Sequence, residues 1–141
     1  MKCVAWAVLL LGLMAVSPGA LSAQDAQAAS QVSLGRNYPN PFNPETWIPF
    51  QVPASLFTSD HRPVVSLRIY NVLAQLVAIP ILQGSGESLD KLTPEWNGTG
   101  QYVAYWDGKY LGSNREAASG VYVYQLEVDG VRKTDRMTII K

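Results

Sequence analysis

The sequence predicts an all-β protein folded as a two-sheet sandwich, and three observations lead to this expectation. Short runs of apolar and β-branched residues alternate with polar residues at a period of two. Gly, Pro and Asn interrupt these runs at short intervals, as the turns between strands require. Beyond the N-terminal segment, no apolar pattern with a period of 3.6 residues persists through three helical turns. With 141 residues, of which 48% are apolar, the chain is long enough for one domain with its own core.

The N-terminal segment has the three parts of a secretory signal peptide. Lys2 supplies the positive charge, an apolar run extends from residue 4 to residue 16, and small residues lead to Ala23. Because that run is shorter than the roughly 20 residues a helix needs to cross a bilayer, we expect no transmembrane anchor after cleavage. We predict a signal peptide at residues 1–23, with a second cleavage site at Ala26-Gln27-Ala28, and hence export to the periplasm, the cell surface or the medium.

The composition of the exported chain excludes several kinds of site. Cys3 is the only cysteine and precedes the apolar run, whereas the lipid-modified cysteine of a lipoprotein follows it. Cleavage therefore removes every thiol, and no disulfide or thiolate metal site remains. Removing residues 1–23 takes away one charged residue, Lys2, and leaves ten basic against eleven acidic residues. We expect no strong field that would attract nucleic acid or an anionic membrane.

The rest of the chain divides into a linker and one folded domain. Residues 24–34 are rich in Gln, Ala and Ser, which predicts a short linker, and we expect the domain to cover residues 35–141. Residues 37–44 hold three prolines and three asparagines. Each proline fixes φ and restricts the residue before it, so this segment is predicted to be a rigid loop.

Six runs after this loop have the character of strands: 47–52, 65–70, 76–82, 101–106, 121–128 and 131–140. Pro49 and Pro80 lack a backbone N–H, which places the first and third of these runs at a sheet edge or a bulge. Asp129-Gly130 predicts a two-residue hairpin turn, since that turn requires positive φ. Residues 83–100, with four glycines, are either a mobile loop or contain another short strand.

Four segments carry a resemblance to a known family: residues 35–50, 67–71, 105–108 and 119–126, which read GRNYPNPFNPETWIPF, LRIYN, YWDG and SGVYVYQL. In this order and spacing they resemble the C-terminal sorting domains of bacterial type IX secretion and the related immunoglobulin-like domain of the flagellar hook-cap protein. The resemblance implies an immunoglobulin-like β-sandwich of about seven short antiparallel strands. It also implies a non-catalytic role in secretion sorting or cell-surface attachment, with partners in the secretion machinery or among cell-envelope proteins. The family usually has glycine where this chain has Ala74, so the turn there must avoid positive φ or accept strain.

Three motifs admit a structural and a functional interpretation. The 37–44 segment is either a structural clip, in which Pro fixes φ and Asn caps turns, or a recognition epitope for a secretion machine. Trp106-Asp107-Gly108 suggests a metal or sugar site, but a buried Trp at a strand end followed by an Asp–Gly turn also explains it. Ser119-Gly120 reads as a bend that starts a strand. We predict structural roles for Asn37, Pro39, Asn40, Pro41, Phe42, Asn43, Pro44, Trp106, Asp107, Gly108, Ser119 and Gly120.

The sequence predicts no catalytic residue, no cofactor and no metal site. His61 is the only histidine and lies in a polar loop, which excludes a histidine cluster and leaves a Ser-His-Asp triad no other base. The carboxylates of the 83–100 loop show no pairing suited to acid–base catalysis. Asn97-Gly98-Thr99 matches the N-glycosylation pattern, which three-residue segments also match by chance.

Two binding functions therefore remain open. The basic residues of the last strand are candidates for a sorting signal: Arg132, Lys133, Arg136 and Lys141. The second half of the chain is also rich in aromatic residues: Tyr102, Tyr105, Trp106, Tyr110, Tyr122 and Tyr124. Some of these must lie in the core, and an exposed subset would form a patch. The alternative to sorting is thus a carbohydrate- or protein-binding sandwich module.

Overall fold

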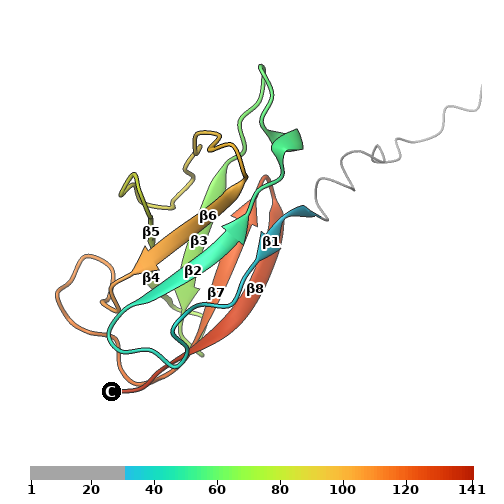
Figure 1. The fold of residues 1–141 in the computed structure, drawn as a ribbon. Coiled ribbons are helices and arrows are strands. Elements are labelled where there is room, and N and C mark those ends of the chain that lie inside the picture. Colours follow the sequence, from blue (N-terminus) through green and yellow to red (C-terminus); the bar gives the residue numbers. More distant parts are fainter. Residues whose placement is uncertain (1–30) are drawn as a thin grey trace, which may run out of the picture.

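A computed structural model describes residues 31–141, which form two four-stranded antiparallel sheets packed face to face. Figure 1 shows β2 and β6 nearer to the viewer than β7 and β8. The predicted all-β sandwich is confirmed. The predicted signal peptide and most of the predicted linker lie outside the described residues. Within residues 31–141 there is no helix of the length and apolar character that crossing a membrane would need.

Each sheet combines strands that are distant in the sequence. Sheet A has the order β1-β2-β6-β5, with β1 at Ser33–Leu34, β2 at Thr46–Gln51, β6 at Gln101–Trp106 and β5 at Ile81–Leu82. Sheet B has the order β4-β3-β7-β8, with β4 at Leu76–Ala78, β3 at Val65–Tyr70, β7 at Gly120–Val128 and β8 at Val131–Ile139. A 3-10 turn at Ala54–Leu56 follows β2. The two long strands of sheet B, β7 and β8, form its hairpin edge.

The core fills the space between the sheets with alternate residues of each strand. Successive side chains of a strand point to opposite faces, so a half-buried strand shows a period of two. β7 follows this rule, because Tyr122, Tyr124, Leu126 and Val128 are buried whereas the residues between them are partly exposed. The core also includes the following residues: Val32, Phe42, Ile48, Phe50, Val52, Val65, Leu67, Ile69, Leu89, Tyr102, Ala104, Trp106, Met137 and Ile139.

The turn between β7 and β8 has the predicted geometry. Asp129 and Gly130 both adopt positive φ, at 48° and 83°. These values suit a two-residue hairpin turn whose twist matches that of the flanking strands. The Asp129 carboxylate also accepts a hydrogen bond from the backbone N–H of Val64 at 2.9 Å, which ties the turn to the start of β3.

The edge prediction is wrong for Pro49 and confirmed for Pro80, because β4 and β5 on either side of Pro80 are both edge strands. Pro49 lies in β2, an interior strand between β1 and β6, and not at a sheet edge. The carbonyl of Pro49 accepts the Gly35 N–H at 2.8 Å, so the backbone nitrogen of Pro49 also points toward Gly35. Gly35 lies just after the end of β1, so the missing N–H of Pro49 removes no hydrogen bond between β1 and β2. The run at 76–82 is not one strand, because the chain leaves sheet B before Pro80 and joins sheet A after it.

The folded domain begins earlier than the sequence predicts. Val32 is almost fully buried and belongs to the core, and β1 pairs with β2 through Ser33–Gln51 and Leu34–Phe50. The last residues of the predicted linker are therefore part of sheet A. They escaped prediction because two residues are too few to show a strand period.

The 83–100 segment forms single-residue bridges to neighbouring strands at Ser88 and Leu92, and it packs onto the sandwich. Leu89 is fully buried, and its carbonyl accepts the Leu67 N–H at 2.9 Å. Val65 and Leu92 exchange backbone hydrogen bonds of 2.7 and 2.9 Å. The segment thereby covers the part of β3 that the short strand β4 leaves unpaired.

Candidate functional site

The 37–44 clip holds the start of the domain to the core. The Asn37 side chain is buried, and its Nδ2 donates to Thr46 Oγ1 at 3.1 Å and to the Pro39 carbonyl at 3.2 Å. The Tyr124 hydroxyl accepts the Asn37 N–H at 3.2 Å and donates to the Gly35 carbonyl at 2.9 Å. Burial is the largest cause that raises the pKa of Tyr124 to about 12. This network supports the structural interpretation of Asn37 and Pro39.

The same clip closes the edge of sheet B. Phe42 donates its N–H to the Thr138 carbonyl at 3.1 Å and accepts the Ile140 N–H at 3.2 Å, so it pairs with the end of β8. Asn40 Oδ1 accepts the Thr138 N–H at 3.1 Å. The buried Phe42 ring meets Trp106 edge-on, with the ring centroids 5.6 Å apart. The other clip residues are exposed: Pro39, Pro41, Asn43 and Pro44.

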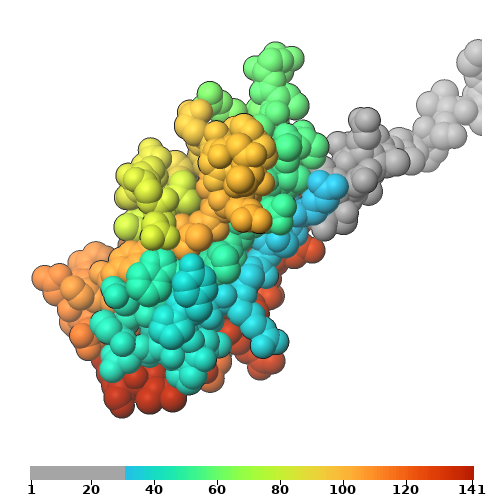
Figure 2. Space-filling model, in the orientation of Figure 1, coloured from blue at the N-terminus to red at the C-terminus, as the bar shows by residue number. Residues whose placement is uncertain are grey.

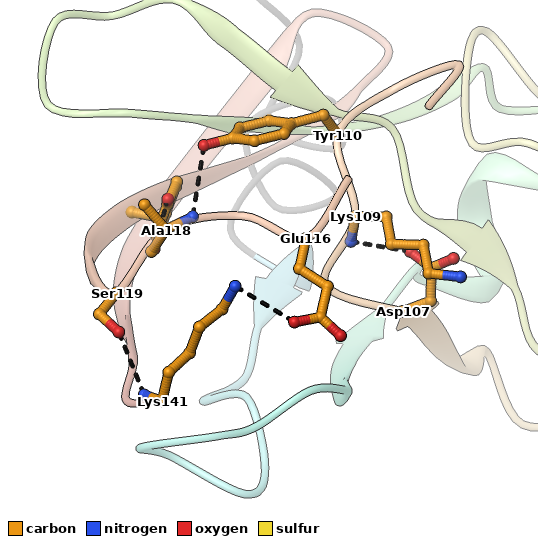
Figure 3. A network of polar contacts seen from close by, with 8 residues as sticks. Asp107, Lys109, Tyr110, Glu116, Ala118, Ser119 and Lys141 are labelled. Atoms are coloured by element: carbon orange, nitrogen blue, oxygen red, sulfur yellow. Dashed lines mark hydrogen bonds and ion pairs between the residues drawn. The ribbon is translucent and has the colours of Figure 1, made fainter. Parts of the chain in front are cut away.

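The Trp106-Asp107-Gly108 motif forms a turn at the end of β6. Trp106 is buried, and its indole N–H donates to the Lys109 carbonyl at 2.9 Å. Asp107 accepts the Lys109 N–H at 3.0 Å (Figure 3). Gly108 has φ +78°, and a Cβ placed there would lie 2.0 Å from the Pro44 carbonyl oxygen. The glycine is therefore required both by the turn and by the close approach of the clip.

The Ser119-Gly120 motif fastens the C-terminus. Ser119 Oγ accepts the Lys141 N–H at 3.1 Å, and Lys141 Nζ lies 3.2 Å from a Glu116 carboxylate oxygen. Figure 3 shows these two contacts on either side of the Lys141 side chain. Gly120 opens β7 opposite Ile139, with φ +151°. The motif thus joins the 107–119 loop to the last residue of the chain.

The four basic residues proposed for sorting do not form one patch. Arg132 and Arg136 pair with Glu127 and Val123 in the ladder, on the outer face of sheet B. Lys133 pairs with Leu126, whose side chain points toward the core, so Lys133 lies on the other face of β8. Lys141 lies beyond the strand and contacts Glu116. Arg132 and Arg136 alone remain a joint candidate, and Arg132 Nε is already 3.5 Å from Glu127.

Some of the aromatic residues lie in the core and others at the surface. Tyr102, Trp106, Tyr122 and Tyr124 are buried, whereas Tyr105 and Tyr110 are partly exposed. Tyr105 pairs with the partly exposed Trp47, and the exposed Tyr38 bridges to Trp47. Neither of these two belongs to the aromatic set predicted from the sequence. The signal for Trp47 was present in the sequence, because it alternates with the core residues of β2 and must therefore face outward.

These residues form an apolar outer surface on sheet A, here called the aromatic face. Its members are Tyr38, Trp47, Pro49, Ile81, Val103 and Tyr105, which the ladders place opposite one another. The Tyr38 and Trp47 rings lie 6.2 Å apart and 16° from parallel, and the Trp47 and Tyr105 rings lie 5.6 Å apart. Tyr38 is 50% exposed. In Figure 2 no other described segment covers the strands that carry this face.

Most polar groups at the border of the aromatic face are uncharged or already paired, but Asp107 and Lys109 line a hollow that also includes Ile81 and Tyr105. The Tyr105 hydroxyl donates to Glu45 Oε2 at 2.5 Å, and this hydrogen bond is the largest cause that raises the pKa of Tyr105 to about 12. Two shallow grooves adjoin the face. The first is lined by Ser33, Gly35, Pro49, Phe50, Gln51, Gln101, Tyr102 and Val103, and the second by Trp47, Ile81, Leu82, Gln83, Gly84, Ser85, Gly86 and Tyr105. Neither lining includes an ionisable carboxylate or a basic side chain.

The titratable groups of the loops form pairs. His61 Nε2 lies 2.7 Å from Asp129 Oδ2, with about half of the histidine side chain exposed. Arg68 pairs with Asp90 at 2.8 Å. Residues 31–141 contain no group of three or more His, Cys, Asp or Glu side chains placed to hold a metal ion. The arrangement of these side chains is that of surface ion pairs that fasten loops.

No protein-family model, no curated protein and no solved structure matches the chain.

Proposed function

We propose that this chain is an exported, non-catalytic interaction module that is sorted to, or attaches at, the cell surface. The observation that carries the proposal is how the sandwich distributes its side chains. The polar groups of the three motifs bond the domain together, while one outer sheet face carries neighbouring aromatic and apolar side chains: Tyr38, Trp47, Ile81, Val103 and Tyr105. Other exposed apolar residues, such as Val72, Leu73 and Leu111, lie in loops. An apolar patch on the outer face of a sheet in a small domain is typical of a surface that meets another molecule.

Export and sorting rest on the sequence. The charged, apolar and small-residue parts of residues 1–23 are those of a secretory signal peptide. The four ordered segments resemble type IX sorting domains, and in the structure they occupy β2, β3, the end of β6 and β7. The non-catalytic role is supported by the loop position of His61 and its pairing with Asp129.

A reporter fusion tests sorting. The full chain fused to a neutral reporter is expressed in a bacterium with type IX secretion, and the reporter is located by protease accessibility on intact cells. We expect the reporter at the cell surface, and a strain without the secretion machinery should keep it in the periplasm. A folded fusion that stays in the periplasm of the competent host would contradict sorting.

A charge reversal tests whether β8 carries the signal. Arg132→Glu with Arg136→Glu changes the outer face of the edge strand, and exposed substitutions usually shift stability by less than about 0.5 kcal/mol each. The control is Lys91→Glu with Arg115→Glu, which changes the net charge equally at other exposed positions. If the secretion machinery recognises β8, only the Arg132→Glu with Arg136→Glu variant should reduce the amount of reporter at the cell surface at equal total abundance.

A further inference from the structure

We propose that the aromatic face binds a neutral, ribbon-shaped polysaccharide whose sugar rings stack on Tyr38, Trp47 and Tyr105. The inference rests on the proposed attachment function and names the class of molecule that the chain would attach to. It commits to a polymer of equatorially linked hexoses, because only such a chain presents flat, largely apolar ring faces in a straight row.

The ring geometry is the first argument. Tyr38 bridges from the clip to Trp47, and Trp47 and Tyr105 are ladder partners in sheet A. The ring centroids lie 6.2 and 5.6 Å apart, and the rings of the first pair are 16° from parallel and those of the second pair 50°. A sugar ring has an apolar C–H face, and an aromatic side chain supplies a complementary flat surface with high contact area and little rotamer entropy to lose. A row of rings on a rigid sheet is organised before the ligand arrives, which lowers the cost of binding.

The length of the face is the second argument. Along β2 and β6 the outward pairs are Trp47–Tyr105, then Pro49–Val103, then Gln51–Gln101. Successive outward pairs are separated by two residues, so the three pairs extend over about 13 Å at the usual strand rise. This length runs along the strands, whereas the row of Tyr38, Trp47 and Tyr105 runs across them. The face therefore extends in both directions and exceeds what a single sugar would cover.

The polar border is the third argument, and it separates a glycan from other occupants. The two grooves beside the face offer the amides of Gln51, Gln83 and Gln101 and the hydroxyls of Ser33 and Ser85. Neutral amides and hydroxyls exchange hydrogen bonds with sugar hydroxyls in both directions. A membrane surface would instead favour several Lys and Arg side chains around the aromatic residues. These two grooves contain neither, and Lys109 is the single basic residue in the lining of the hollow beside Ile81 and Tyr105.

Calorimetric titration tests the inference. The full-length chain is purified in the form that an exporting host produces and is titrated with cellohexaose and with chitohexaose, while maltohexaose serves as the curved, axially linked control. We expect saturable binding of at least one ribbon-shaped hexamer and at least about tenfold weaker binding of maltohexaose. Absence of binding to both ribbon-shaped hexamers, or equal binding of maltohexaose, would overturn the proposal.

Two substitutions and one control locate the binding surface. Trp47→Ala and Tyr38→Ala should each weaken binding by about tenfold or more, since each removes a stacking ring. Tyr38 is 50% exposed, so its replacement keeps the test valid if Trp47→Ala unfolds the domain. Tyr70→Ala removes the same kind of side chain from the outer face of sheet B and should leave affinity unchanged. Loss of binding in Tyr70→Ala, or full binding in both test variants, would overturn the proposal.

The remaining occupant, a second copy of this chain, is distinguished by sedimentation without glycan. We expect a monomer, and a dimer that Tyr38→Ala dissociates would assign the face to self-association and overturn the glycan proposal. The reporter experiment on sorting is independent of these measurements. A reporter that reaches the surface on a chain that binds no hexamer would refute the glycan inference and leave the sorting function intact.

Discussion

The outer faces of the two sheets differ in chemistry although the sheets have similar size. The outer positions of sheet A are mainly aromatic and apolar, and they make up the aromatic face. The outer positions of sheet B include the aromatic and apolar residues Tyr70, Leu76, Val121 and Val123, but most are polar: Ser66, Arg68, Gln125, Glu127, Arg132, Thr134, Arg136 and Thr138. Within the fold the two faces are equivalent, because each is the outer side of one sheet. The apolar character of sheet A is therefore not needed for folding.

Sheet B shows how this chain protects an edge strand from pairing with another chain. Its long edge strand β8 carries Arg132 and Arg136 on the outer face. It also carries Lys133 and Asp135 on the inner face, where their ladder partners are core residues. Charges on and within an edge strand oppose pairing with another chain. The aromatic face of sheet A carries no charged residue, as our proposal of a binding surface there requires.

The largest difference in stability is expected between substitutions of Trp106 and Trp47, the two tryptophans in the strands of sheet A. Trp106→Ala should lower the free energy of unfolding by about 3–5 kcal/mol, because it empties a buried site between Phe42 and Tyr122. Trp47→Ala should cost about 1 kcal/mol, because its ring lies on the outer face. Urea denaturation of both variants measures the difference, and equal losses would mean that Trp47 serves the core.

Substitutions of two glycines test how firmly the 37–44 clip packs against the turn that follows β6. Gly108 and Gly112 have similar positive φ, +78° and +67°, but only Gly108 faces a neighbour that a Cβ would strike, the Pro44 carbonyl. Gly108→Ala should therefore destabilise the domain by about 2 kcal/mol more than Gly112→Ala, since backbone strain is similar at the two positions. Thermal unfolding compares them. A smaller difference would show that the clip moves away at little cost.

Two tyrosines with raised pKa values separate the face from the core. Both Tyr105 and Tyr124 have a pKa of about 12, the first mainly through Glu45 and the second mainly through burial. Because the folded pKa exceeds the unfolded value of about 10, stability is fully present below pH 10 and declines as the pH rises toward 12. Glu45→Gln should lower the pKa of Tyr105 and leave that of Tyr124 unchanged, which ultraviolet titration can follow. A shift of both residues would contradict separate environments.

The smallest effect is expected at the turn between β3 and β4. Ala74 has φ +60°, a conformation that glycine adopts without steric cost, and Asn71 holds the turn by accepting the N–H groups of Leu73 and Gln75, both at 3.0 Å. Ala74→Gly should raise the free energy of unfolding by about 0.5–1 kcal/mol, less the entropy that glycine adds to the unfolded chain. A lower melting temperature would show that the entropy term exceeds the strain.

The sequence predicts the long strands and the turns better than it predicts the surfaces. β2, β3, β6, β7 and β8 and the Asp129-Gly130 turn follow from a period of two and from the backbone demands of glycine. β1 and β5 have two residues each, so pairing with a neighbour defines them and no local pattern can.

The aromatic face was only partly predictable for a related reason. Alternation along β2 and β6 indicates that Trp47 and Tyr105 face outward, but it does not reveal that β2 and β6 are neighbours. Tyr38 joins them through a single isolated bridge to Trp47, formed by a loop that carries no strand signal. The basic residues of β8 show a second limit, because their charge alone does not reveal that the ladder places Arg132 and Arg136 on one face and Lys133 on the other.

The central claim is that the outer face of sheet A is the binding surface of the molecule. Co-sedimentation of the purified full-length chain with cell envelopes of a type IX secreting bacterium tests it most directly, with melting temperatures recorded for every variant. We predict that the chain binds envelopes, that Trp47→Ala with Tyr105→Ala abolishes most of this binding while the protein stays folded, and that Tyr70→Ala binds as the parent does. Equal binding of the parent and the folded double variant would contradict the claim.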